Sequence, residues 1–159
     1  DDARLRARRF TIAYLARRAR TEHEVRDALR QRDFAGEVVD HAIERLKSLN
    51  YLDDADYARR YVDSRVKAKG YGPMRLRREL QRRGVAAALI EAAIAPLEAS
   101  NELEEQALAQ ARGRLNRLRR EPDERKRRKK LSDFLLRRGF DFDTISPVVE
   151  TVLREARVG

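Results

Sequence analysis

The apolar positions of this chain recur in three stretches, over residues 21–46, 72–97 and 126–153. A shift of 51 residues carries the apolar positions of the first stretch onto the second, and a shift of 55 carries those of the second onto the third. The aligned triplets are Val25, Leu76 and Leu131; Leu29, Leu80 and Leu135; Phe34, Val85 and Phe140; Val39, Ile90 and Ile145; Ile43, Ile94 and Val149; and Leu46, Leu97 and Val152. Recurrence of this kind indicates stacked supersecondary units.

In the first unit, the apolar residues follow helical spacing in three segments. The spacing predicts helices over residues 3–19, 22–32 and 36–49. Thr21 and Glu24 have the spacing of a capping box, in which each residue satisfies a free amide at the start of a helix. The first unit is therefore expected to consist of three short helices.

The second unit opens at Leu52, where Asp53 or Asp54 is expected to cap a helix that runs to about residue 68. Tyr57 and Tyr61 have the spacing of its buried side, together with Val62 and Val66. These aromatic residues are thus predicted to belong to the core rather than to a base-stacking platform.

Proline and glycine place the other helix ends of the second unit. Pro73 is suited to the first position of a helix, because its missing N–H has no partner to lose there. Gly84 is expected to end that helix in a left-handed conformation. The following helix, over residues 86–95, is expected to end or kink at Pro96.

The third unit repeats this order with a longer first helix. Apolar spacing over residues 103–118 predicts an amphipathic helix, which residues 121–123 interrupt. A very basic helix over 124–138 should close at Gly139, and a last helix, which contains Pro147, reaches about residue 155. We therefore predict an all-α fold, a tandem array of three three-helix repeats over 1–50, 51–99 and 100–159, elongated and curved.

Charge suggests the kind of partner. The chain has 159 residues, 37 of them Lys or Arg and 27 Asp or Glu, for a net charge of +10. Such an excess favours a polyanionic partner, although a basic surface can also be merely solvated. Cysteine is absent and no apolar run is long enough to span a membrane, so we expect a cytoplasmic protein with no membrane contact. The net charge favours a monomer. Met74 is the only methionine, so we expect the natural chain to begin before residue 1.

No pattern in the sequence indicates catalysis. His23 and His41 lie 18 residues apart, without the spacing of a metal site. The acidic residues Asp53, Asp54 and Asp56 are explained by helix capping. No glycine-rich phosphate loop or nucleophile elbow is present. We therefore expect no enzyme activity, no metal and no cofactor.

The basic residues are the candidate site. Two clusters are proposed to contact a phosphate backbone, and the competing interpretation is a solvated helix face. The candidates are Arg65, Lys67, Lys69, Arg75, Arg77, Arg78, Arg82, Arg83, Arg127, Arg128, Arg137 and Arg138. Arg82 and Arg137 share one repeat position, and Arg83 and Arg138 share the next. Gln81 is the only base-reading amide in these helices, so DNA contact is expected to be independent of sequence.

Residues 49–85 contain a Leu-Asp-Asp cap, an aromatic-Ala pair, a Gly-Pro turn, and a basic helix with Glu-Leu and a closing Gly. These are Leu52-Asp53-Asp54, Tyr57-Ala58, Gly72-Pro73, Glu79-Leu80 and Gly84. This series of motifs resembles the signature of the bacterial RecX family. The threefold repeat extends the resemblance over residues 4–153. The outer units depart from it at Thr21, Val25 and Asp33, where serine, leucine and glycine are more usual.

The resemblance implies a regulator of the recombinase RecA that lies along the groove of its filament on single-stranded DNA. It implies inhibition of the recombinase, ATPase and coprotease activities, and a place in DNA repair, recombination and the SOS response. The residues alone leave other functions open. One is a direct, sequence-independent nucleic-acid binder. Another is a scaffold that assembles helical partners through apolar grooves.

Overall fold

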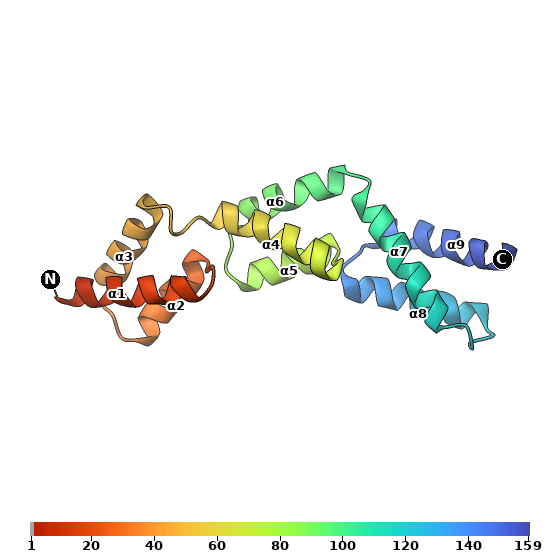
Figure 1. The fold of residues 1–159 in the computed structure, drawn as a ribbon, viewed down its shortest axis with the longest axis horizontal. Helices are drawn as coiled ribbons and strands as arrows, with labels where there is room; N and C mark the ends of the chain where they lie inside the picture. The colour runs from red at the N-terminus through yellow and green to blue at the C-terminus, as the bar shows by residue number, and fades with distance from the viewer. Residues whose placement is uncertain (1) are drawn as a thin grey trace. The chain divides into compact units, whose positions relative to one another are not determined.

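A computed structural model describes residues 2–159, and every regular element in that range is an α-helix (Figure 1). Residue 1, the first position of the predicted first repeat, lies outside the described residues. The helices are α1 (Asp2–Arg17), α2 (Glu22–Gln31), α3 (Gly36–Ser48), α4 (Asp54–Lys69), α5 (Pro73–Arg82), α6 (Ala87–Ala99), α7 (Glu102–Arg117), α8 (Glu124–Arg138) and α9 (Phe142–Val158). None of these helices is long and apolar enough to cross a bilayer. The predicted all-α repeat fold is confirmed.

The chain packs into two compact units, whose bounds differ from those of the three sequence repeats. In the structure, the first unit and the second unit are these two compact units. The first contains the chain up to Tyr61 together with Glu79–Glu91, and the second contains Val62–Arg78 together with Ala92–Gly159. The helices α1, α2 and α3 pack against one another in the first unit, and α7, α8 and α9 do so in the second. The middle helices α4, α5 and α6 contribute one part to each unit.

The repeated apolar positions form the cores. Of the 18 aligned positions, 17 are buried, and Phe34 is half-buried. The first unit encloses Val25, Leu29 and Ile43, which are fully buried, and the second encloses Leu131 and Leu135 in the same way. The apolar pattern therefore predicted the core correctly, because each helix buries only the stripe that faces its neighbours.

The helix starts follow the predicted capping chemistry. The Thr21 side chain accepts from the Glu24 backbone N–H, and the Glu24 carboxylate accepts from the Thr21 N–H at 3.1 Å, which completes the capping box. At the start of α4, Asp53 is the capping residue, since its carboxylate accepts from the Asp56 N–H at 3.0 Å. Pro73 is the first residue of α5, as expected.

Three details of the sequence-based prediction are wrong. Of the two alternatives predicted at Pro96, a helix end or a kink, the helix end is wrong: α6 continues to Ala99, because Leu97 is buried and continues the apolar stripe past the proline. Leu49, predicted to be the last residue of its helix, follows the end of α3 at Ser48 and is 49% exposed. Tyr57 and Tyr61 are half-buried rather than core residues, because their hydroxyls form hydrogen bonds with the polar side chains of Arg83 and Glu79.

Candidate functional site

In the first unit, the start of α2 meets the end of α5. The Thr21 hydroxyl donates to the Arg83 carbonyl oxygen at 2.6 Å, and the Glu22 N–H donates to the Asp54 carboxylate at 3.0 Å. Gly84 has a φ of 81°, and a Cβ atom there would lie 2.3 Å from the Cβ of His23. Glycine at this position therefore ends α5 and also leaves room for the close approach of His23 on α2.

In the second unit, the start of α5 meets the end of α8 through backbone groups. The Gly72 N–H donates to the Arg138 carbonyl oxygen at 2.8 Å, and the Met74 N–H donates to the Gly139 carbonyl oxygen at 2.9 Å. Gly139 has a φ of 101°, and a Cβ atom there would lie 2.5 Å from the Cβ of Arg75. Two helix ends are thus joined at a distance that no larger residue permits.

We call each of these contacts between a helix start and a helix end a joint. The two joints involve the same positions of the sequence repeat. The shift of 51 residues aligns Thr21 with Gly72, and the shift of 55 aligns Arg83 with Arg138. A threonine hydroxyl in one joint therefore takes the role that a backbone N–H has in the other. Asp33 aligns with Gly84, and it adopts the same left-handed turn with a φ of 63° while its side chain is exposed. Aspartate is tolerated there because its short polar side chain has room.

Arg83 is held by two tyrosines in the first unit. Its guanidinium donates to the Tyr57 hydroxyl at 3.0 Å and lies 4.9 Å from the centre of the Tyr61 ring. The Tyr61 hydroxyl donates to the Glu79 carboxylate at 2.8 Å. Burial raises the pKa of the Tyr57 hydroxyl, and the positive charge of Arg83 opposes that rise. The arginine therefore stabilises the joint and is not available as a free cation.

Arg138 has the equivalent role in the second unit. Two guanidinium groups contact the Tyr71 ring. The guanidinium carbon of Arg75 lies 3.8 Å from the ring centre, and that of Arg138 lies 5.2 Å from it. Arg138 also donates to the Gln110 side chain at 2.9 Å and to the Lys69 carbonyl oxygen. Cation–π contacts of this kind contribute about 0.5–2 kcal/mol each, depending on their exposure. Arg75 and Arg138 are thus structural parts of the joint.

Several other predicted site residues have local partners. Arg77 pairs with Glu98 at 2.9 Å, and Lys67 pairs with Asp63 at 3.1 Å. Arg128 pairs with Glu124 at 3.4 Å and also with Glu150. Arg65 and Arg127 are half-buried, whereas the side chain of Lys69 is exposed. For these paired cations, part of the positive charge is neutralised within the protein.

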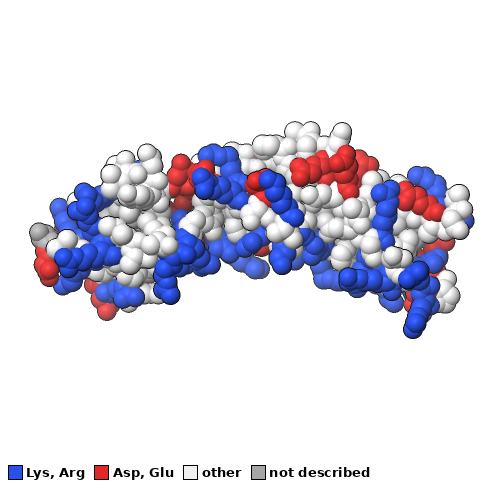
Figure 2. All heavy atoms as spheres, in the orientation of Figure 1, with Lys and Arg blue, Asp and Glu red and all other residues white. Residues whose placement is uncertain are grey.

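Four predicted cations differ from the rest. Lys69, Arg78, Arg82 and Arg137 are exposed, and among residues 2–159 no ion pair or hydrogen bond engages their side chains. Arg78 and Arg82 lie one turn apart on α5, so their side chains project from the same side of that helix. Figure 2 shows Lys and Arg side chains gathered over α8, whereas Asp and Glu side chains gather where α6 meets α7. Among the predicted site residues, the exposed cations without a side-chain partner therefore lie on α4, α5 and α8.

The sequence alone did not reveal which side chains pair with the predicted site arginines inside the folded protein. No pattern in the sequence indicated the contacts of Tyr71, Gln110, Glu98 or Glu150 with these arginines. The contacts of Arg138 with Gln110 span 28 residues, and those of Arg77 with Glu98 span 21, so no local spacing announces them. Within the described part of the chain, no group of three or more His, Asp or Glu residues is arranged to hold a metal ion.

Three family models match the chain in succession. They describe the first, second and third three-helix domains of RecX and match residues 7–46, 53–94 and 102–149. Two proteins named regulatory protein RecX are similar along most of their length. That of Clostridium botulinum (strain Alaska E43 / Type E3) is 35% identical over 153 residues, which cover 96% of this chain and 71% of the relative. That of Prosthecochloris aestuarii is 34% identical over 142 residues, which cover 89% and 90%.

Solved structures agree with these sequence matches. The crystal structure of RecX from Lactobacillus salivarius has a TM-score of 0.87 and 25% sequence identity to this chain, and the match covers 95% of this chain and 97% of that one. A second crystal structure of regulatory protein RecX has a TM-score of 0.82 and 26% identity, with 96% and 72% covered.

Proposed function

Because this chain belongs to the RecX family of regulatory proteins, we propose that it binds the RecA filament on single-stranded DNA, in the filament groove, and inhibits its recombinase, ATPase and coprotease activities. The observation that carries the proposal is a pair of free arginines at one repeat position, Arg82 and Arg137. In each case the next residue, Arg83 or Arg138, is engaged in a joint. In both repeats, therefore, one arginine stabilises the fold and the arginine before it is exposed and can bind a partner.

Free guanidinium groups suit a partner that carries phosphate and carboxylate groups. An exposed arginine with no internal partner contributes little to folding, but it offers a planar, bidentate donor to an oxyanion. We therefore assign direct contact with the filament to Arg78, Arg82, Arg137 and Lys69. We assign an indirect role to the other predicted cations, which support the fold and add to the positive charge of the surface. These are Arg65, Lys67, Arg75, Arg77, Arg83, Arg127, Arg128 and Arg138.

Inhibition then requires no chemistry by this chain, and we propose that it is a binding protein without enzyme activity. Several repeats that each contact the filament would bridge or cap neighbouring recombinase protomers, so that the addition of further subunits fails. The place of action is the cytoplasm, where such filaments form.

The test is ATP hydrolysis by the cognate RecA on single-stranded DNA, measured as this protein is titrated from well below one molecule per RecA protomer. We expect inhibition at substoichiometric amounts, and we expect the triple variant Arg78→Glu, Arg82→Glu and Arg137→Glu to lose it. The matched control reverses Arg9, Arg17 and Arg30, which are exposed residues of α1 and α2 and give the same change in net charge. Equal inhibition by both triple variants would refute the assigned contact surface.

The second candidate function is direct, sequence-independent nucleic-acid binding, which the same free arginines favour. It predicts that inhibition appears only when enough protein is present to coat the DNA. It also predicts tight binding to a single-stranded oligonucleotide without RecA, with affinity that falls steeply as salt rises. Substoichiometric inhibition, with DNA in excess of what the protein could cover, would exclude this alternative.

A further inference from the structure

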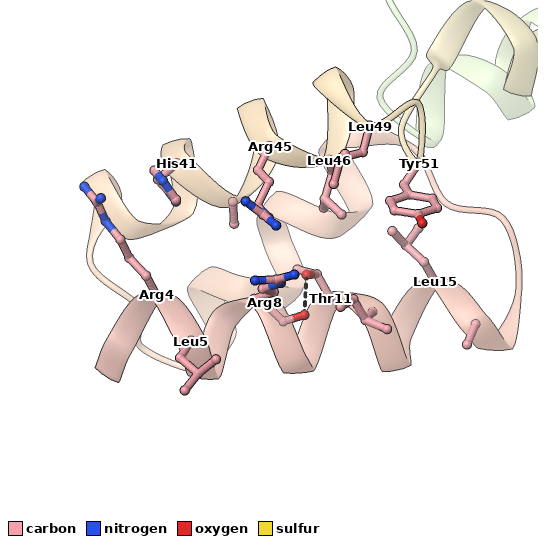
Figure 3. A pocket seen from close by; sticks show the side chains of 13 residues that line it. Arg4, Leu5, Arg8, Thr11, Leu15, His41, Arg45, Leu46, Leu49 and Tyr51 are labelled. Atoms are coloured by element: carbon pink, nitrogen blue, oxygen red, sulfur yellow. Dashed lines mark hydrogen bonds between the residues drawn. The ribbon is translucent and has the colours of Figure 1, made fainter. Parts of the chain in front are cut away.

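A groove of about 760 Å³ lies between α1 and α3 in the first unit, and none of the residues assigned above lines it (Figure 3). Its walls are mainly apolar. Leu5, Ile12, Leu49 and Tyr51 line it and are 44%, 53%, 49% and 64% exposed. Large apolar side chains that gather in one concave place and remain exposed are typical of an interaction surface.

The groove is also positively charged. Arg4, Arg8 and Arg45 line it together with His41, and no Asp or Glu is among its lining residues. Figure 3 shows the side chains of Arg8 and Arg45 projecting into the space between the two helices. Throughout residues 2–159, no acidic side chain pairs with these three arginines. The groove therefore combines an apolar floor with uncompensated cations.

We infer that this groove binds an acidic amphipathic helix of a partner protein. A helix laid between α1 and α3 would place its apolar stripe, with spacing i, i+3, i+4 and i+7, against Leu5, Ile12 and Leu49. Its Asp and Glu residues, which flank that stripe, would meet the arginines. Charge complementarity thus selects an acidic helix over a basic or neutral one.

A nucleic acid is a poorer occupant of this groove. Phosphates would satisfy the arginines, and Tyr51 could stack on a base. However, the aliphatic side chains of Leu5, Ile12, Leu15 and Leu49 would then face a hydrated backbone and would gain little burial. The inference concerns residues other than the RecA-contacting arginines, so it stands or falls separately from the proposed function.

The test is direct binding of a labelled synthetic peptide, measured by fluorescence polarisation. The peptide has about 14 residues, which span about 21 Å as a helix. Leu and Ile occupy its apolar stripe, and Glu occupies both flanks. One control peptide has the same composition in an order without a stripe, and a second has Lys in place of Glu. We expect the acidic amphipathic peptide alone to bind.

Two variants and one control locate the binding site. Ile12→Glu places a carboxylate on the apolar floor, and Arg8→Glu reverses a charge beside it. Each should weaken peptide binding by about tenfold or more. Ile12 is 53% exposed, so its replacement should not disturb folding. The matched control is Phe142→Glu, at a residue that is 70% exposed and outside the groove, and it should leave binding unchanged.

Several outcomes would overturn the inference. These include equal binding of the reordered or lysine peptide, or equal binding by wild type and both groove variants. Loss of oligonucleotide binding in Ile12→Glu, with peptide binding unaffected, would assign the groove to nucleic acid. A dimer that sediments as such in wild type and dissociates in Ile12→Glu would assign the groove to a second copy. RecA inhibition by the same variants is measured separately, so failure of one proposal is distinguishable from failure of the other.

Discussion

The Thr21 hydroxyl donates to the Arg83 carbonyl oxygen at 2.6 Å and at the same time accepts from the Glu24 N–H at 3.2 Å. A hydroxyl group has one hydrogen to donate and two lone pairs, so it can take both roles. Thr21 is fully buried, which leaves no water to replace either bond. One side chain therefore couples the start of α2 to the end of α5.

Thr21→Val should lower the free energy of unfolding by roughly 2–3 kcal/mol, because it removes a helix cap and leaves the Arg83 carbonyl unsatisfied. Thr21→Ser keeps both hydrogen bonds and should cost only about 1 kcal/mol, for the lost methyl group. Urea denaturation followed by circular dichroism measures both values. Equal losses in the two variants would show that the hydroxyl is not what stabilises this joint.

Gly139→Ala should be strongly destabilising, by roughly 2 kcal/mol or more, because alanine is strained at a φ of 101° and its Cβ would clash with Arg75. Gly113→Ala is the matched control. Gly113 lies inside α7 with open space around it, so alanine should raise stability there by about 0.5–1 kcal/mol. Thermal unfolding of both variants would test this difference in sign, and destabilisation of similar size in both would contradict it.

Arg137→Ala should affect mainly binding and Arg138→Ala mainly stability, although the two residues are adjacent. Arg137 is exposed without a side-chain partner, so its loss should leave stability within about 0.5 kcal/mol and weaken binding to the filament. Arg138 contacts Tyr71 and Gln110, so its loss should lower stability by roughly 1–3 kcal/mol. Melting temperature and ATPase inhibition, measured on both variants, separate the two roles. The same division is expected between Arg82 and Arg83.

Asp54 should make stability depend on pH. Burial raises the pKa of its carboxyl group, and the hydrogen bond from the Glu22 N–H only partly opposes that rise. The unfolded chain therefore releases this proton at a lower pH than the folded chain does. The stabilising contribution is fully present below the ordinary pKa of aspartate and is lost as pH rises through the higher folded value.

Asp54→Asn keeps an oxygen that can accept from Glu22 and removes the charge. We expect the variant to gain stability over wild type as pH rises from about 3 towards 7, and the two proteins to differ least at the acidic end. Urea midpoints at several pH values measure the difference. A difference that does not change with pH would contradict the assigned role of the carboxylate.

Much of this fold could be predicted from the sequence because its determinants are local. The apolar period placed the core, Thr21 and Glu24 lie at capping-box spacing, and Gly84 and Gly139 end helices as their lack of a side chain allows. Pro96 shows the limit of local reasoning. Its preference to end a helix is overcome by the burial of Leu97, which depends on packing against other helices.

For the candidate site, the sequence by itself determined that basic residues recur at fixed repeat positions, and it determined the family signature. Only the tertiary structure decided which of those residues are free. Arg83 is engaged by Tyr57, 26 residues away, and Arg77 by Glu98, 21 residues away, whereas Arg82 and Arg137 remain exposed. The physical reason is that a charge pairs with whatever folding brings within a few ångströms of it, and separation along the chain does not reveal that neighbour.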